Sequence, residues 1–158
     1  MPDGNLFFEQ DGFTYSLYEK EYIQNLHQDK KTPTPDSIKS HVIKTKFINS
    51  NPLVSLRKEN ESSFYYNYFL GNDKSKWKSR VRSTSKITYQ ELYKNVDLSV
   101  YTEFGSTKYD FIVKPGAKES EIQIEYLGTD NIYIEDEKLI IVNTINNIEE
   151  AKPFSYQI

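Results

Sequence analysis

A two-residue alternation of apolar and other residues, repeated along most of the chain, constrains the fold more than any other feature of this sequence. In the segment KYDFIVKPGAKESEIQIEY, Tyr109, Phe111 and Val113 alternate with other residues, a Pro-Gly corner follows, and the alternation resumes at Ile122. Successive side chains of a strand point to opposite faces, so a period of two indicates half-buried β-strands. We interpret this segment as two strands of a scaffold joined at a fixed corner.

Roughly ten short runs of this kind, separated by turn signals every 8 to 12 residues, predict the fold class. They indicate an all-β fold, an antiparallel β-sandwich with little helix, for which a jelly-roll-like arrangement is one form. The residues expected in its core are Phe13, Tyr15, Phe47, Leu98, Val100, Phe111, Val113, Ile122, Ile124 and Ile141.

Local signals place several turns and one helical turn. Asp11-Gly12 and Gly105-Ser106 are expected to close hairpins, and Asp73 is expected to cap one turn of helix over residues 73–79. The last seven residues, KPFSYQI, are expected to form a final strand. Residues 19–37 contain two prolines and are interpreted as a connection with at most one helical turn.

The length of 158 residues fits one domain with a sizeable core. Aromatic residues make up 15% of the chain, with 13 tyrosines, and tyrosine suits both half-buried strand positions and exposed binding faces. The opening, MPDGNLFFEQDG, lacks the basic and apolar regions of a signal peptide. We therefore expect residues 1–158 to form a single β-sandwich module and, because the strand pattern starts at once, to be a piece excised from a longer chain.

Charge and cysteine content exclude several function classes. The net charge of -3 argues against a general nucleic-acid binder, and the absence of cysteine excludes disulfides and Cys-based zinc sites. The basic cluster of residues 74–82 is interpreted as a solvated loop and strand edge, with phosphate contact as the alternative. No apolar run approaches the ~20 residues of a membrane span. No cofactor or metal is expected, because neither GNDKSKW nor EDEK matches a calcium-binding loop.

The sequence offers few candidate catalytic groups. His27 lies in a polar connection, and His41 lies on an alternating strand, where an imidazole with satisfied hydrogen bonds is expected. A glycosidase needs two carboxyl groups ~5–10 Å apart, for which Asp97 and Asp110, set between apolar strand residues, are the most interesting acids. Glu103, Glu121 and Glu125 are further candidates. We expect such acids to bond backbone N–H groups instead, so the chain is not expected to be an enzyme.

Carbohydrate binding is the ligand role that the sequence best supports. Sugar rings stack on exposed aromatic side chains, and Tyr65, Tyr66, Tyr68 and Trp77 lie close together in sequence. These four residues are the candidate ligand-binding set, and Trp77 is the strongest single candidate. The competing expectation is that the tyrosines pack in the core.

Several segments together resemble a known family. They are GNLFFEQDGFTYSL, HVIKTKFINSNP, YNYFLGNDKSKW, ITYQELYKNVDLSVY, KYDFIVKPGAKESEIQIEYLG and KPFSYQ, which cover nearly the whole chain in order. The chain resembles the N-terminal domain of large secreted proteins of gliding Gram-negative bacteria, where it precedes SBBP-type β-propeller repeats. Within this resemblance, residues 19–37 have the character of a variable insertion.

The resemblance implies a function as well as a location. It implies a non-catalytic extracellular module, secreted or displayed on the bacterial cell surface, with a structural or adhesion role. Its expected partners are neighbouring domains of the parent protein and cell-surface glycan. The alternatives are a glycan-binding module and a carboxylate-dependent glycoside hydrolase. The family supplies no catalytic residues to carry over.

Overall fold

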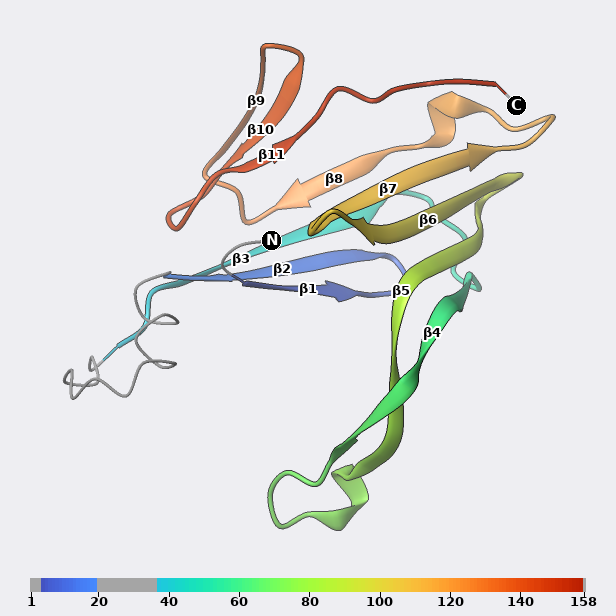
Figure 1. Cartoon of the computed structure of the whole chain (residues 1–158). Coiled ribbons are helices and arrows are strands. Elements are labelled where there is room, and N and C mark those ends of the chain that lie inside the picture. Colours follow the sequence, from blue (N-terminus) through green and yellow to red (C-terminus); the bar gives the residue numbers. More distant parts are fainter. Residues whose placement is uncertain (1–3, 20–36, 158) are drawn as a thin grey trace. The chain divides into compact units, whose positions relative to one another are not determined.

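The computed structural model describes residues 4–19 and 37–157, and it is built almost entirely of strands (Figure 1). Every strand pairing is antiparallel. The helices of the described residues are two three-residue 3-10 turns, η1 (Lys74–Lys76) and η2 (Glu119–Glu121). The predicted all-β, antiparallel fold with little helix is therefore confirmed.

The chain divides into two compact units. One, here called the terminal unit, comprises Met1–Ile48 and Gln123–Ile158. The other, the central unit, comprises Asn49–Ile122. Each unit has its own sheet or sheets, so each is described separately.

The terminal unit contains a four-stranded sheet of order β1-β2-β3-β8 and a three-stranded sheet of order β11-β10-β9. The strands of the first sheet are β1 (Gly4–Phe8), β2 (Gly12–Tyr18), β3 (Ser40–Phe47) and β8 (Ile124–Leu127). Those of the second are β9 (Asn131–Glu135), β10 (Lys138–Val142) and β11 (Ile148–Glu150).

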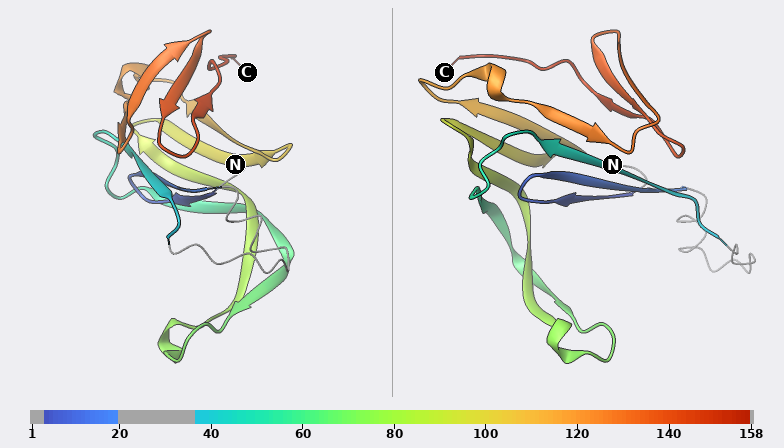
Figure 2. Two further views of the ribbon diagram at one scale, coloured as in Figure 1. Left: turned by 90° about the vertical axis from the view of Figure 1, so that its left-hand side faces the viewer. Right: turned by 180° about the vertical axis from the view of Figure 1, so that it is seen from behind.

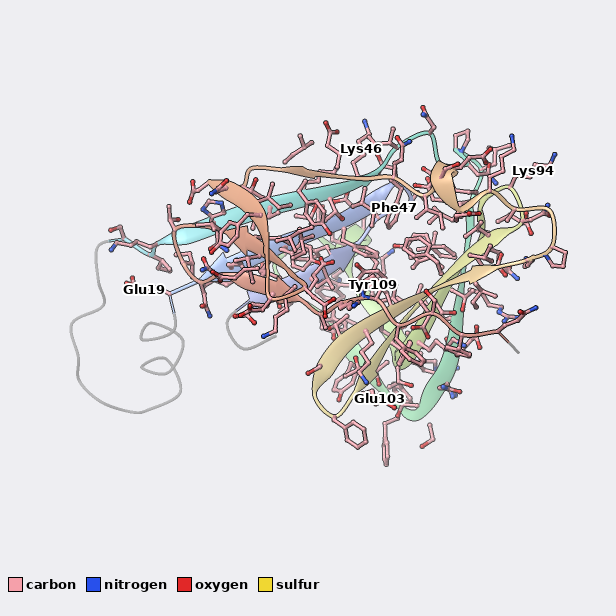
Figure 3. The ribbon with its side chains drawn as sticks, turned by 90° about the horizontal axis from the view of Figure 1, so that it is seen from above. Glu19, Lys46, Phe47, Lys94, Glu103 and Tyr109 are labelled. Atoms are coloured by element: carbon pink, nitrogen blue, oxygen red, sulfur yellow. The ribbon has the colours of Figure 1, made fainter. Side chains whose placement is uncertain are left out.

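Alternation along β2 and β3 builds the core of the terminal unit. Phe13 and Tyr15 are buried on one face of β2, as predicted, and Leu17 is buried with them. On β3, Lys46 is exposed and Phe47 is buried, and Figure 3 shows the two side chains pointing to different sides of the strand. The rings of Phe13 and Phe47 meet edge to face with centroids 5.1 Å apart, an arrangement that aromatic pairs favour.

The central unit contains one sheet of order β4-β5-β6-β7. Its strands are β4 (Ser55–Tyr68), β5 (Lys78–Tyr93), β6 (Val96–Glu103) and β7 (Ser106–Val113). β5 pairs with β6 only from Lys86 to Tyr93. Beyond Lys86, β4 and β5 therefore continue as a two-stranded ribbon past the end of β6 (Figure 1).

The segment with which the sequence analysis began joins the two units. β7 belongs to the central sheet, and β8 belongs to the terminal unit. Between them, the N–H of Ala117 donates to the carbonyl of Lys114 at 3.0 Å across Pro115-Gly116, with Gly116 at a φ of 83°. Proline at the second position and a positive-φ glycine at the third define a type II β-turn. The Pro-Gly corner is thus structural.

The predicted core is partly confirmed. Six of its ten residues are buried, whereas Phe111, Ile122 and Ile124 are half-buried. Val113 is 50% exposed, so its prediction was wrong. It lies on β7, an edge strand of the central sheet, where alternation continues although less of each face is covered.

Some local predictions also need correction. The β6–β7 hairpin turns at Phe104-Gly105, where both residues have positive φ, one residue earlier than predicted. The final segment KPFSYQI is not a strand over residues 152–157, since the last strand ends at Glu150. By contrast, Asp73 does cap a short helical turn. The interpretation of residues 19–37 as a connection falls almost entirely outside the described residues.

Candidate functional site

The four residues predicted to bind a ligand lie in the distal part of the β4–β5 ribbon. We call residues 61–84 the distal ribbon, because the Glu61–Thr84 pair lies just beyond the point where β5 leaves β6. The ribbon ends in a loop that contains the 3-10 turn η1, which both views of Figure 2 show. It belongs entirely to the central unit.

The three tyrosines of the candidate set are exposed on the distal ribbon. Tyr65, Tyr66 and Tyr68 have 53%, 58% and 47% of their surface exposed. The competing expectation that they pack in the core was wrong. The tyrosines are exposed because β4 and β5 continue past the end of β6, so that no third strand lies beside this part of the ribbon.

Strand register decides which side chains share a face. Tyr66 pairs with Val81 and Tyr68 with Lys78, with a register shift between the two pairs. At this shift Arg80 adopts a φ of 55°, and its N–H donates to the Asn67 side chain at 2.9 Å. The extra residue forms a β-bulge on β5, while Tyr66 and Tyr68, two residues apart on β4, lie on the same face.

Trp77 organises the loop at the end of the ribbon. It is half-buried, and its indole N–H donates to the carbonyl of Gly71 at 3.1 Å. The ring of Phe69 lies 5.3 Å from the indole centroid, and the ammonium group of Lys74 lies 5.8 Å from it, within cation–π range. The strongest predicted ligand residue is therefore already engaged, and the tyrosines offer more free ring surface.

Asp73 stabilises the same loop as an N-cap. Its carboxylate accepts hydrogen bonds from the N–H of Ser75 at 3.0 Å and from the Ser75 hydroxyl at 2.7 Å. These bonds, together with Lys76, hold the pKa of Asp73 below its ordinary value. The carboxylate thus serves the turn.

The distal ribbon is basic in an acidic chain. It carries five cationic residues and two acids, hence a net charge of +3, whereas the whole chain carries -3. The cations are Lys74, Lys76, Lys78, Arg80 and Arg82, and all of them are exposed, as expected of a solvated loop and strand. Cations interleaved with exposed aromatic rings give the ribbon two means of holding an anionic partner.

Sequence reasoning missed the purely apolar members of this surface. Phe64, Phe69 and Leu70 are 78%, 56% and 76% exposed. The signal was present in the segment FYYNYFL, in which six of seven residues are aromatic or aliphatic without alternation. A strand with apolar residues on both faces exposes some of them unless both faces are covered.

The candidate acid Asp97 belongs to a different cluster of the central unit. Its carboxylate accepts the N–H of Glu91 at 2.8 Å and the ammonium group of Lys114 at 2.9 Å, and Lys114 also bonds the Glu91 carboxylate at 2.8 Å. Partial burial raises the pKa of Asp97, but these hydrogen bonds more than offset it and lower the pKa overall. The expected bond from a backbone N–H is confirmed for Asp97.

The remaining candidate acids do not join Asp97. Glu103 forms an ion pair with Lys108, and Glu121 lies 3.9 Å from Lys118. Figure 3 shows Glu103 at the β6–β7 turn and Lys94 at the opposite end of β6. Asp110 is exposed rather than buried and accepts a hydrogen bond from Tyr101, whose pKa is raised by burial and by this acid. Glu125 is exposed on β8.

Comparison with protein families assigns the whole chain to a family. The family described as a domain of unknown function, DUF7948, matches residues 1–158. The chain belongs to the DUF7948 family. No curated protein and no solved structure matches this DUF7948 domain.

His41 of the DUF7948 domain has the satisfied environment that the sequence predicted. It is half-buried on β3, with Nδ1 2.8 Å from the Thr144 hydroxyl and Nε2 2.6 Å from the carbonyl of Gly128. Both ring nitrogens are thus used to tie β3 to segments that flank the second sheet of the terminal unit. The other candidate, His27, lies outside the described residues.

Residues 4–19 and 37–157 contain no cluster of three or more His, Asp or Glu residues arranged to hold a metal ion. Within the same described ranges, no helix has the length and apolar character needed to cross a bilayer.

Proposed function

We propose that this chain is a non-catalytic module of a large secreted or cell-surface protein, with a structural or adhesion role. The observation that carries the proposal is the distal ribbon, which exposes aromatic, aliphatic and cationic side chains on a two-stranded support. A two-stranded hairpin is marginally stable alone. Such a surface gains stability when a partner covers it.

The composition of the ribbon is that of a recognition surface. Tyr, Trp, Phe and Arg are enriched in protein interfaces, and large exposed apolar patches mark sites of interaction. The partners that we propose are neighbouring domains of the parent protein and cell-surface glycan. We also propose that the protein is located at the bacterial surface and that this domain precedes SBBP-type repeats. The resemblance of the sequence supports both parts of the proposal.

The surroundings of the candidate acids favour this role over glycoside hydrolysis. Asp97 is neutralised by Lys114 and accepts a backbone N–H, and its pKa is lowered. A general acid in a glycosidase needs a raised pKa so that it remains protonated. Hydrolysis of a glycan that is lost in Asp97→Asn, with folding intact, would contradict the proposal.

Glycan binding by the ribbon is the second candidate function. Tyr65, Tyr66 and Tyr68 present exposed rings, which could stack on the C–H faces of sugars. Because Trp77 is engaged within the loop, we expect the tyrosines to contribute more contact area than Trp77.

Two experiments test these roles. In the longer native protein, deletion of residues 1–158 should abolish surface display or adhesion, and full function after this deletion would refute the structural role. On a broad glycan array, binding by the isolated chain should fall in Tyr66→Ala and, less, in Trp77→Ala. Phe104→Ala is the matched control, since Phe104 is 96% exposed on a different hairpin. Absence of binding on the array would remove the glycan role and leave the structural one.

A further inference from the structure

A second exposed surface complements the distal ribbon, and it lies on the β9–β10 hairpin of the terminal unit. Strand β9 forms one edge of its three-stranded sheet, and all five of its residues are exposed. Ile132 and Tyr133 are each 40% exposed, and Ile134 is 77% exposed. An exposed edge strand with apolar side chains is a template for association with another chain.

The same hairpin is acidic. Residues 130–142 contain four acids and one lysine, which gives a net charge of -3. Two of these acids, Asp136 and Glu137, form the two-residue turn and have φ values of 48° and 62°. Positive φ at both positions is the signature of a type I′ turn, which places both acids at the tip of the hairpin, where Glu137 also pairs with Lys152.

Two surfaces on different units thus have opposite charges, and both expose apolar side chains. The distal ribbon carries +3 with exposed aromatic side chains, and the β9–β10 hairpin carries -3 with an exposed apolar edge. We propose that the distal ribbon of one copy docks on the β9–β10 hairpin of a second copy of this chain. Opposite charges guide the approach and set the register, and the apolar contacts hold the complex.

The charges also disfavour contacts between like surfaces. Two ribbons would bring +3 against +3, and two hairpins would bring -3 against -3, and like charges across an interface oppose binding. The contact therefore joins a ribbon to a hairpin, either reciprocally in a two-fold dimer or from head to tail between different neighbours. Heterologous contacts build rings when the rotation closes and open chains when it does not. This inference is independent of where the protein is located.

Self-association of the full chain tests the proposal. Sedimentation velocity over a range of concentrations should show mass increasing with concentration at low salt and decreasing as salt is added, because salt screens the charges. Lys76→Glu with Lys78→Glu changes the ribbon to -1, and Glu135→Lys with Glu137→Lys changes the hairpin to +1. Each double variant should self-associate at least ~10-fold more weakly.

Mixing the two double variants gives the decisive result. The first variant retains an acidic hairpin and the second retains a basic ribbon, so an equimolar mixture should form a heterocomplex although neither variant associates alone. The matched control for the ribbon variant is Lys46→Glu with Lys94→Glu, which makes the same change in net charge at exposed sites outside both surfaces. This control should associate as the unsubstituted chain does. Circular dichroism verifies that each variant is folded.

Three outcomes would overturn the proposal. The first is a chain that stays monomeric at all concentrations. The second is association that the hairpin variant leaves unchanged, or a mixture of variants that forms no complex. The third is a monomer whose ribbon instead binds an acidic polysaccharide such as alginate, with loss in Lys76→Glu/Lys78→Glu but not in Glu135→Lys/Glu137→Lys. This last result would assign the ribbon to glycan.

Discussion

The two ends of strand β5 differ sharply in the burial of their side chains. Near its C-terminal end, Thr88, Tyr89 and Leu92 are buried, whereas Lys78 and Arg82 near its N-terminal end are exposed. The strand is continuous and has β4 beside it at both ends. The difference is that β6 flanks only the buried end.

Tyrosines lie at both the buried and the exposed end of the β4–β5 ribbon, and comparing them shows what determines burial. Tyr89 of β5 is 0% exposed and Tyr66, on the distal part of β4, is 58% exposed. Because tyrosine has an apolar ring and a polar tip, it is compatible with either environment. Neighbouring strands, rather than residue type, determine whether a position of this ribbon joins the core.

The largest expected contrast is in local opening. Amide protons of β5 from residue 87 to 93 should exchange only through near-global unfolding, whereas those from Lys78 to Arg82 should exchange through local opening of the ribbon. The free energy of opening should be at least ~3 kcal/mol lower at the exposed end, since local stabilities range from nearly zero to the global value. Native-state hydrogen exchange measured by NMR gives both values. Equal opening free energies along β5 would show that the ribbon unfolds with the core.

Two identical substitutions sharpen the comparison. Leu92→Ala should lower the free energy of unfolding by about 2–5 kcal/mol, because Leu92 is fully buried and its truncation leaves a cavity. Leu70→Ala, in the loop of the distal ribbon, should change it by less than about 0.5 kcal/mol, because Leu70 is 76% exposed. Urea unfolding followed by circular dichroism provides the measurement. A large effect of Leu70→Ala would mean that the ribbon loop is covered in solution.

A smaller effect is expected for the carboxylate that anchors the buried end. Asp97→Asn should lower stability at neutral pH by about 1.5–3 kcal/mol, because hydrogen bonds to a charged group contribute this much. The pKa of Asp97 is lowered in the folded state, so its stabilisation is complete above the unfolded pKa and is lost as pH falls through the folded pKa. The difference between the two proteins should therefore shrink below about pH 4.

Asp73→Asn is the matched control in the distal ribbon. Asparagine caps a helical turn about as well as aspartate, so this substitution should leave the global unfolding midpoint unchanged at every pH. If Asp97→Asn had the same effect at pH 7 and pH 3, the stabilising role of the carboxylate charge would be refuted.

Much of the fold followed from residue patterns. Alternation at Phe13 and Tyr15 correctly predicted a buried face, and Asp73 correctly predicted a capped helical turn. These features depend on a few adjacent residues, so the sequence contains the information directly. The exposure of Val113 did not follow, because it depends on β7 being an edge strand.

The candidate site was located but not understood from the sequence. The four aromatic residues do lie together on one ribbon, because they are close along the chain. The exposure of the tyrosines could not be predicted, since it results from β6 ending short of the ribbon. The complementary charge of the β9–β10 hairpin was also invisible, because partner surfaces can be recognised only once exposed residues are known.

The position of Trp77 also determines what optical spectroscopy can see. It is the only tryptophan of the chain, and its ring packs against Phe69 in the loop of the distal ribbon. Selective excitation of tryptophan therefore reports on this loop alone, while buried tyrosines such as Tyr89 report on the core. If the ribbon opens first, the tryptophan and tyrosine signals will change at different denaturant concentrations. Unfolding will then show two transitions, one for the ribbon loop and one for the core. Tryptophan fluorescence alone would then underestimate the stability of the fold. A partner that covers the ribbon would change the emission of Trp77.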